Sequence, residues 1–388
     1  MLRGSVWAFL AAAFLIATAH AAEPAPGVTA DRILFGQSAA FSGPAGALGT
    51  ALRRGLRAAF AEVDRAGGIG GRRLDLVAYD DQYEPERTIA NVRRLLDEDR
   101  VFALVGEVGT PTSLAVEPIA RAAGVPFLGP VTGASALRAP ERATTIHLRA
   151  SYARETEEMV EHLTTDLGFT RIAVLYQDDS FGKEGLDGVH QALERRAMKT
   201  VSEGNYPRST TAVKAALLDI RSAEPQAVII VGSYGPSAMF IKWARKLGME
   251  CVFVSTSFVG SSRLAAELGP DGSGVMVTQV VPFPWDASLP VVAQFQAALA
   301  ASEPDAEPGF LELEGYLVGR LVAALAARAG PQPTRESFLG AVRTMSAFDL
   351  GGVQLVYGPG DGEGSDRVYL TMIGPDGRYV AIDRMSPP

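Results

Sequence analysis

Short runs rich in β-branched residues alternate with helical patterns from Ile33 onward. This alternation is typical of βαβ units, in which helices cover a parallel sheet. The pattern runs twice along the chain, because a second series of strands begins after Ala150. The sequence therefore predicts an α/β fold with two lobes, each a parallel sheet flanked by helices. The expected strands are 33–38, 74–80, 102–107 and 126–129 in the first series, and 171–177, 200–206, 227–233, 251–255 and 274–280 in the second.

The C-terminal part indicates how the two lobes are joined. Helical patterns at 309–329 and 335–345 precede a tail, 351–383, of short strands separated by Gly, Pro and Asp turns. This tail is too short to form a third domain, so we expect it to complete one of the sheets. The chain must then cross between the lobes more than once, and we place crossings near Ala150, Val280 and Gly351. The prediction is two Rossmann-like lobes joined by a three-crossing hinge, with lobe 1 formed by residues 31–150 and 281–350 and lobe 2 by residues 151–280 and 351–388.

Residues 1–21 are typical of a secretory signal. Arg3 supplies a positive start, an apolar stretch follows from Val6 to Ala17, and small residues surround Ala21. The apolar stretch is about 12 residues long, shorter than the roughly 18–20 that span a bilayer. We therefore expect a soluble mature protein that is not embedded in a membrane. Since no cysteine stands at the cleavage point, we expect no lipid anchor, which favours the periplasm; secretion into the medium is the alternative.

Charge and composition remove several classes of function. The chain has 36 Lys and Arg against 44 Asp and Glu, a net charge of −8, which disfavours binding to nucleic-acid phosphates. The single cysteine, Cys251, excludes a disulfide scaffold, and its position in a predicted strand favours a packing role. Four scattered histidines leave little for a metal cage. We therefore predict no metal, no cofactor and no nucleic-acid partner.

Several motifs that suggest chemistry have simpler structural explanations. The glycine run 67–71 follows a helix and precedes a strand, the reverse of a dinucleotide-binding loop, so it predicts a turn. The aspartate pairs 80–81 and 178–179 each precede a helix start, where aspartates cap free N–H groups. No Gly-x-Ser-x-Gly elbow occurs, and no nucleophile with a base is evident. The sequence therefore predicts no catalytic residues and no enzyme.

Two loops are stronger candidates for a functional site. Residues 106–113 and 129–135 each follow an apolar strand and contain small, hydroxyl-bearing residues. The carboxyl ends of neighbouring parallel strands meet at one edge of a sheet, where hydroxyl and free N–H groups suit an anion. A carboxylate bridging the two loops is one interpretation, and ordinary helix caps are the other.

At these loops the chain resembles the type I periplasmic solute-binding proteins of the leucine/isoleucine/valine-binding group, over essentially the whole mature sequence. The order and spacing of the matching stretches carry the resemblance. It implies two lobes joined by three crossings, a small solute bound between them, and delivery of that solute by a monomer to an inner-membrane ABC permease and its ATPases. The matching stretches are 41–44, 66–72, 79–81, the two loops above, 178–182 and 313–316.

The resemblance also implies a set of binding residues. The ligand carboxylate would meet Thr110 and groups of residues 131–133 in the first lobe, with help from Ser135. Apolar walls, two side chains that close over the solute from the second lobe, and Tyr152 beside a crossing would complete the site. The implied set is Leu48, Glu107, Gly109, Thr110, Val131, Thr132, Gly133, Ser135, Tyr152, Phe181, Tyr234, Ser257 and Phe310.

One position departs from the family pattern. Amino-acid-binding relatives hold the ligand ammonium with an acid after the strand 252–255, and Ser257 stands there in this chain. A buried ammonium without a carboxylate partner is strongly disfavoured. Either Glu107 supplies the missing charge from the other lobe, with Glu312 as a further option, or the ligand is a carboxylate, amide or other solute lacking that ammonium.

The predicted mechanism is hinge closure around the solute, with a permease recognising the closed shape. A ligand-sensing receptor of the same fold, which signals instead of transporting, is the alternative.

Overall fold

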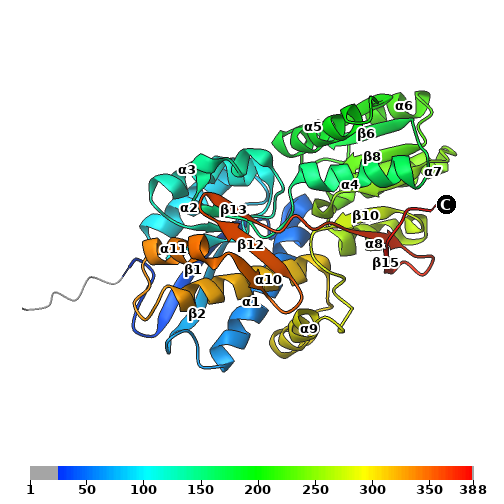
Figure 1. The fold of residues 1–388 in the computed structure, drawn as a ribbon. Helices are drawn as coiled ribbons and strands as arrows, with labels where there is room; N and C mark the ends of the chain where they lie inside the picture. The colour runs from blue at the N-terminus through cyan, green and yellow to red at the C-terminus, as the bar shows by residue number, and fades with distance from the viewer. Residues whose placement is uncertain (1–24, 387–388) are drawn as a thin grey trace, which may run out of the picture.

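The computed structural model describes residues 25–386, so the predicted signal segment lies outside the described residues. Two lobes stand side by side, each built on one main sheet (Figure 1). The first sheet is parallel with the order β2-β1-β3-β4-β5. Its strands are β1 (Arg32–Ala39), β2 (Arg73–Asp80), β3 (Ala103–Val105), β4 (Phe127–Leu128) and β5 (Thr145–Ile146).

The second sheet has seven strands in the order β15-β14-β10-β9-β8-β6-β7. The strands β6 to β10 are parallel, while β14 and β15 from the tail add in antiparallel orientation. The tail therefore completes a sheet, as predicted. The strands are β6 (Ile172–Gln177), β7 (Ser202–Tyr206), β8 (Ala227–Val231), β9 (Val252–Ser255), β10 (Met276–Gln279), β14 (Tyr369–Ile373) and β15 (Tyr379–Ile382).

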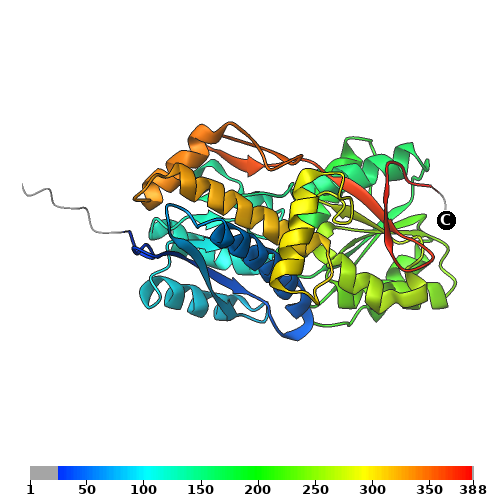
Figure 2. The same cartoon turned by 90° about the horizontal axis from the view of Figure 1, so that it is seen from below.

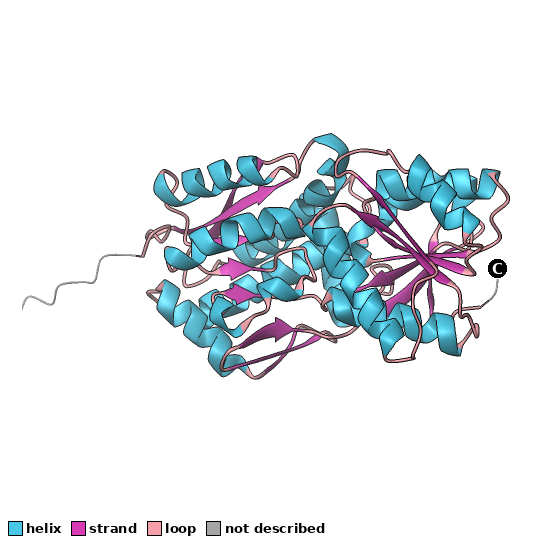
Figure 3. Ribbon diagram, turned by 90° about the horizontal axis from the view of Figure 1, so that it is seen from above, coloured by secondary structure: helices cyan, strands magenta, loops and turns pink. Residues whose placement is uncertain are grey.

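Helices lie on the faces of both main sheets (Figure 3). Strand β8 is buried along its whole length, which explains its unbroken Ala-Val-Ile-Ile-Val sequence. Among residues 25–386, no helix is long and apolar enough to cross a membrane. The helices are α1 (Gly46–Arg65), α2 (Pro85–Asp97), α3 (Thr110–Ala122), α9 (Pro290–Ser302), α10 (Phe310–Arg328) and α11 (Arg335–Met345) with the first sheet, and α4 (Tyr152–Thr165), α5 (Ser180–Glu194), α6 (Lys214–Ser222), α7 (Tyr234–Lys246) and α8 (Ser261–Leu268) with the second.

The third crossing between the lobes lies later than predicted. A small antiparallel sheet of β11 (Ala347–Asp349), β12 (Gln354–Gly358) and β13 (Asp361–Gly364) packs against the first lobe before the chain leaves it (Figure 1). The His147 backbone N–H beside β5 donates to the Gly362 carbonyl at 2.7 Å, and the Tyr357 hydroxyl donates to the His147 carbonyl at 2.8 Å. The predicted crossing near Gly351 is therefore wrong, because the tail first uses the open edge of β5, and the passage follows Gly364.

Helices α1 and α10 pack unusually closely in the first lobe, where they run side by side (Figure 2). Glycines make this approach possible: a Cβ at Gly55 would overlap the carbonyl oxygen of Glu312, and a Cβ at Gly315 would overlap that of Leu52. Small residues at such positions let two helix backbones meet. The glycines of these two helices are thus packing residues.

Replacing Gly55 by Ala is expected to reduce the free energy of unfolding by about 1–3 kcal/mol, because the added methyl group forces α1 and α10 apart. Urea denaturation measures the change. Gly340→Ala in α11 is the matched control, since the nearest atom to a Cβ there, in the Arg343 side chain, would be 4.0 Å away and alanine favours a helix. Equal effects of the two substitutions would contradict this account of the helix contact.

Candidate functional site

The two hydroxyl-bearing loops meet at the carboxyl edge of the first sheet. The Val131 N–H donates to the Glu107 carbonyl at 2.7 Å, and the Gly109 N–H donates to the Val131 carbonyl at 3.2 Å. These bonds bring the Oγ atoms of Thr110 and Thr132 to 2.6 Å from each other, with both side chains fully buried. Helix α3 has no side-chain cap, so the Thr110 hydroxyl is not used to cap it. The two loops therefore bring a pair of threonine hydroxyls together, and the carboxylate that would bridge the loops stays a prediction.

Four aromatic side chains lie against these loops, and we call them the aromatic wall: Tyr83, Tyr152, Phe181 and Phe258. Their ring centroids are 5.3 Å apart for Tyr152 and Phe181, 4.5 Å for Phe181 and Phe258, and 6.1 Å for Tyr83 and Phe258. Each ring is at most 2% exposed. The wall combines Tyr83 from the first lobe with three residues of the second.

Two glycines of the loops allow the wall to approach. Gly109 has φ +102°, and a Cβ there would overlap the Tyr83 ring. A Cβ at Gly133 would lie 2.5 Å from the Tyr152 backbone nitrogen. The predicted residues Gly109 and Gly133 thus serve as close-packing positions beneath the two tyrosines.

The Tyr152 hydroxyl is fully buried and has no hydrogen-bond partner among the residues that the structure describes. Burial raises the pKa of Tyr152 to about 12, although Arg149 and the Thr132 hydroxyl act in the opposite direction. The phenol therefore stays neutral and keeps its proton as a donor at neutral pH. Of the predicted residues, Thr110, Thr132, Tyr152 and Phe181 are brought together.

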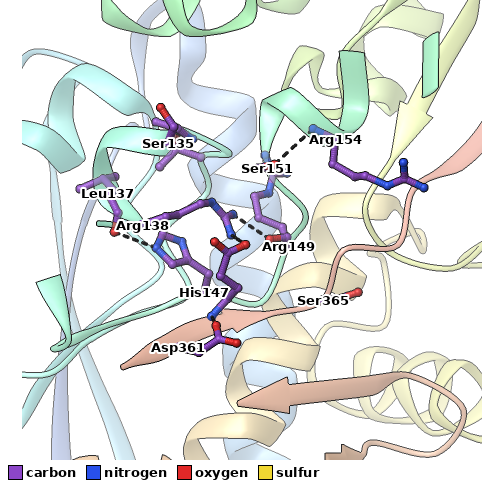
Figure 4. A network of polar contacts seen from close by, with 12 residues as sticks. Ser135, Leu137, Arg138, His147, Arg149, Ser151, Arg154, Asp361 and Ser365 are labelled. Carbon is purple, nitrogen blue, oxygen red and sulfur yellow. Dashed lines mark hydrogen bonds and ion pairs between the residues drawn. The ribbon is translucent and has the colours of Figure 1, made fainter. Parts of the chain in front are cut away.

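Residues near the first crossing, just before Tyr152 in the chain, form a network of polar contacts (Figure 4). The Arg138 guanidinium donates to the Arg149 carbonyl at 2.8 Å, and the His147 ring is 3.1 Å from the Leu137 carbonyl. Ser151 then caps α4 by accepting a hydrogen bond from the Arg154 N–H. Tyr152 is the first residue of that capped helix, so its orientation follows from the crossing.

Ser257, the position at which the family resemblance implies an acid, donates two hydrogen bonds to the carboxylate of Glu155 in α4. The Ser257 N–H and hydroxyl donate to Glu155 at 2.8 and 2.9 Å, and the Thr278 hydroxyl donates at 2.6 Å. Glu155 is fully buried, and burial raises its pKa against these donors. The sequence did not indicate that Glu155 lies beside Ser257. An acidic residue in the first turn of a helix is common, because the helix dipole stabilises its negative charge, so it does not by itself mark a functional site.

Glu107 does not supply the missing charge by any contact in the structure. Neither carboxyl oxygen is hydrogen-bonded to another residue within 25–386. Burial raises the pKa of Glu107 well above its usual value, and the nearby carboxylate of Asp81 acts in the same direction. Both influences favour the neutral acid, which offers no negative charge to an ammonium group.

Ser135 has a different role from the predicted one. Its N–H and hydroxyl donate to Glu184 of α5 at 3.1 and 2.8 Å, so it joins the two lobes. A second contact between the lobes pairs Glu84 with Arg208 at 2.7 Å. That Ser135 assists the ligand carboxylate stays a prediction, and the structure adds a contact of Ser135 with the second lobe.

The remaining predicted apolar residues line a groove of about 550 Å³ between the lobes. Leu48 and Phe310 come from α1 and α10 of the first lobe, and Tyr234 comes from α7 of the second. Gly260, which also lines the groove, follows Phe258 of the aromatic wall by two residues, and a Cβ there would overlap or crowd Leu48 and Tyr234. The groove thus lies next to the aromatic wall.

Within the described part of the chain, no group of three or more His, Cys, Asp or Glu side chains is arranged to hold a metal ion.

Asp81 predicts a measurable pH dependence of stability. It accepts hydrogen bonds from the Ser38 hydroxyl, the Thr88 hydroxyl and the Tyr83 N–H at 2.9, 3.1 and 2.8 Å, yet burial raises its pKa to about 6. A folded-state pKa above the unfolded one means that stability is present at low pH and lost as pH rises. We expect this residue to remove roughly 3 kcal/mol from the free energy of unfolding between pH 4 and 7.

Asp81→Asn removes this titration and keeps an acceptor for the Tyr83 N–H. Urea denaturation from pH 4 to 8 should therefore give a flatter stability profile for the variant than for the wild type. Since other buried acids titrate in both proteins, the difference between the two profiles is the informative quantity. Parallel profiles would show that Asp81 ionises normally in the folded protein.

Comparisons with known proteins agree with this architecture. A model of the periplasmic binding protein family matches residues 33–378. A structure of a possible leucine/isoleucine/valine-binding protein from Rhodopirellula baltica is 37% identical, covering 93% of this chain and 98% of that one, with a TM-score of 0.87. A substrate-binding periplasmic protein from Ralstonia solanacearum is 32% identical, covering 90% and 100%, with a TM-score of 0.85.

A curated relative, the Leu/Ile/Val-binding protein homolog 7 of Brucella abortus, is 29% identical over 228 residues. That match covers 56% of this chain and 56% of the relative, so the chain spans about half the length of that relative. The two-lobed α/β fold, the match across residues 33–378 and the similar solved structures lead to one conclusion: this chain belongs to the periplasmic binding protein family, whose members bind solutes and are not enzymes.

Proposed function

We propose that this protein is the solute-binding component of an ABC importer. It captures a small amino-acid-like or carboxylate solute between its lobes and delivers it to an inner-membrane permease and its ATPases. Residues 1–21 direct it to the periplasm and are removed on export. The names of the Brucella and Rhodopirellula relatives support a link to branched-chain amino acids for those proteins.

The paired hydroxyls of Thr110 and Thr132 carry the proposal. They are fully buried, yet they lie at a sheet edge facing the other lobe, where opening of the hinge exposes them. The Thr132 hydroxyl also accepts a hydrogen bond from the Ala134 N–H at 3.2 Å, so its proton stays available as a donor to Thr110 or to an incoming carboxylate. The adjacent unpartnered Tyr152 hydroxyl adds another donor. Hydrogen bonds to a charged group are about twice as strong as neutral ones.

Contacts between the two lobes stabilise the closed state of the hinge. The bonds of Glu184 to Ser135 and of Arg208 to Glu84 cross between the lobes, as does the packing of Tyr83 on Phe258. A solute held by the first lobe completes this set when the second lobe covers it. To move a mostly open population to a mostly closed one, the solute must prefer the closed form by roughly 5 kcal/mol.

The experiment begins with native mass spectrometry of the mature protein, which identifies any solute retained from expression. The protein is then unfolded, dialysed and refolded, and thermal shift is measured with amino acids, amides and carboxylic acids. A solute that binds should raise the melting temperature and reduce the radius of gyration in X-ray scattering. If no solute of any class changes either quantity, the proposed function is wrong.

Transport is tested separately in cells. Deleting the gene should abolish uptake of the radiolabelled solute, and restoring the wild-type chain should recover it. Normal uptake in the deletion strain would remove the importer part of the proposal and leave solute binding untouched.

A further inference from the structure

The interior of the cleft offers hydroxyl donors and aromatic rings to a solute. Three hydroxyls, those of Thr110, Thr132 and Tyr152, gather beside the two loops, and the aromatic wall covers them. Hydroxyl donors suit an anionic oxygen group, while ring faces and edges suit another ring. The two features together describe a ligand with a carboxylate at one end and a planar ring at the other.

The acids near the cleft are either hydrogen-bonded by the protein or held in the neutral form by burial. Glu155 already accepts three hydrogen bonds from the protein, and these occupy both of its oxygens. Glu107 is fully buried, and burial raises its pKa well above the usual value, with the Asp81 carboxylate acting in the same direction, so its carboxyl group is neutral. An ammonium buried here would therefore lack a dedicated carboxylate partner, which is a costly arrangement.

Glu312, the acid of the groove, is also accounted for. Its carboxylate folds back over Gly309, at the N-terminus of α10, where the helix dipole favours a negative charge. The positive side chain of Arg54 acts on it from α1. Burial nevertheless raises the pKa of Glu312, which favours its neutral form over a carboxylate that could hold an ammonium group.

A buried positive charge stands behind Tyr152. Arg149 is 1% exposed, and its charge acts on both Tyr152 and Glu155. One of its nitrogens, Nη1, has no hydrogen-bond partner in the described range 25–386. The other guanidinium nitrogens pair with the Glu314 carboxylate, which balances the charge, so Arg149 offers a free N–H donor in this region and not an unpaired cation.

We propose, resting on the proposed solute-binding function, that the ligand is a small carboxylate that bears a planar ring and lacks an α-ammonium group. Its carboxylate accepts hydrogen bonds from Thr110, Thr132 and Tyr152. Its ring packs against the aromatic wall and extends toward the groove lined by Leu48, Tyr234 and Phe310.

Matched ligand pairs test the two halves of this proposal. 3-Phenylpropanoate and L-phenylalanine differ only in the α-ammonium group, as do 4-methylpentanoate and L-leucine. Isothermal titration calorimetry on the refolded mature protein should give at least tenfold tighter binding for the acid of each pair. 3-Phenylpropanoate should also bind at least tenfold more tightly than 4-methylpentanoate, because only the former carries a ring.

Variants separate ligand contacts from general stability. Tyr152→Phe should weaken binding of 3-phenylpropanoate about tenfold, because it removes one donor and keeps the ring. Phe258→Leu should reduce the preference for 3-phenylpropanoate over 4-methylpentanoate. Phe240→Leu is the matched control, since Phe240 is equally buried but packs on Phe253 in the core, and it should leave that preference unchanged.

The outcomes distinguish this proposal from the function on which it rests. Tighter binding of L-phenylalanine or L-leucine than of the matching acids would overturn the inference and leave solute binding intact. The same holds if a solute without a ring or a carboxylate is retained or bound more tightly. If no small molecule of any class binds, both proposals fail.

Discussion

Replacing Glu314 by Gln is expected to lower the free energy of unfolding by about 3–5 kcal/mol. Glu314 of α10 accepts two hydrogen bonds from the Arg149 guanidinium, at 2.8 and 2.9 Å, and the two side chains are only 3% and 1% exposed. The substitution leaves the arginine charge buried without its partner. Urea denaturation monitored by circular dichroism measures the loss.

A double variant tests whether the loss of stability comes from the unpaired buried charge of Arg149. Arg149→Met with Glu314→Leu removes both charges and retains apolar volume, so it should recover most of the stability lost by Glu314→Gln. Replacing Glu363, which pairs with Arg138 and is 54% exposed, should cost less than about 1 kcal/mol. If Glu314→Gln costs no more than this exposed-pair variant, the buried pair is not important for stability.

Replacing Thr110 by Val is expected to weaken binding of the cognate solute by about ten- to a hundredfold. The substitution preserves the size of the side chain and removes the hydroxyl that lies 2.6 Å from Thr132. A hydrogen bond to a charged group contributes about 1.5–3 kcal/mol, which corresponds to this range of affinity. Calorimetric titration with whichever solute the screening panel identifies measures the change.

Thr371→Val is the matched control for this prediction. Thr371 is a buried threonine of β14 whose hydroxyl donates to the Val277 carbonyl at 2.8 Å, in the second sheet. We expect it to reduce stability and leave affinity unchanged. Unchanged affinity in the Thr110 variant would place the solute carboxylate elsewhere.

Much of the fold was predictable from local pattern. Most parallel strands of both sheets lie close to their predicted ranges, because burial on both faces imposes continuous apolar runs such as β8. Elements with weaker patterns were missed. Strand β5 has only two residues, and α9 lies in a segment that we assigned no structure. The later third crossing depended on pairing between β13 and β5, which are distant in sequence.

The candidate site was predictable where it depends on loops that follow neighbouring strands. Thr110 and Thr132 were expected to meet, and they do. Tyr83 and Phe258 were missed, because no local pattern marks a side chain that reaches across to the other lobe. Tyr83 follows β2 and has a backbone φ of +66°. The sequence does not predict this unusual conformation.

The alternation of strands and helices along this chain determined its two-lobed α/β class, since each buried strand and each amphipathic helix carries its own hydrophobic period. Only the tertiary structure decided which polar groups pair in the cleft. Glu155 meets Ser257 across 102 positions of sequence and Ser135 meets Glu184 across 49, and the sequence predicted neither pairing. The physical reason is that hydrogen bonding and burial depend on distance in space, and the separation of two residues along the chain does not set that distance.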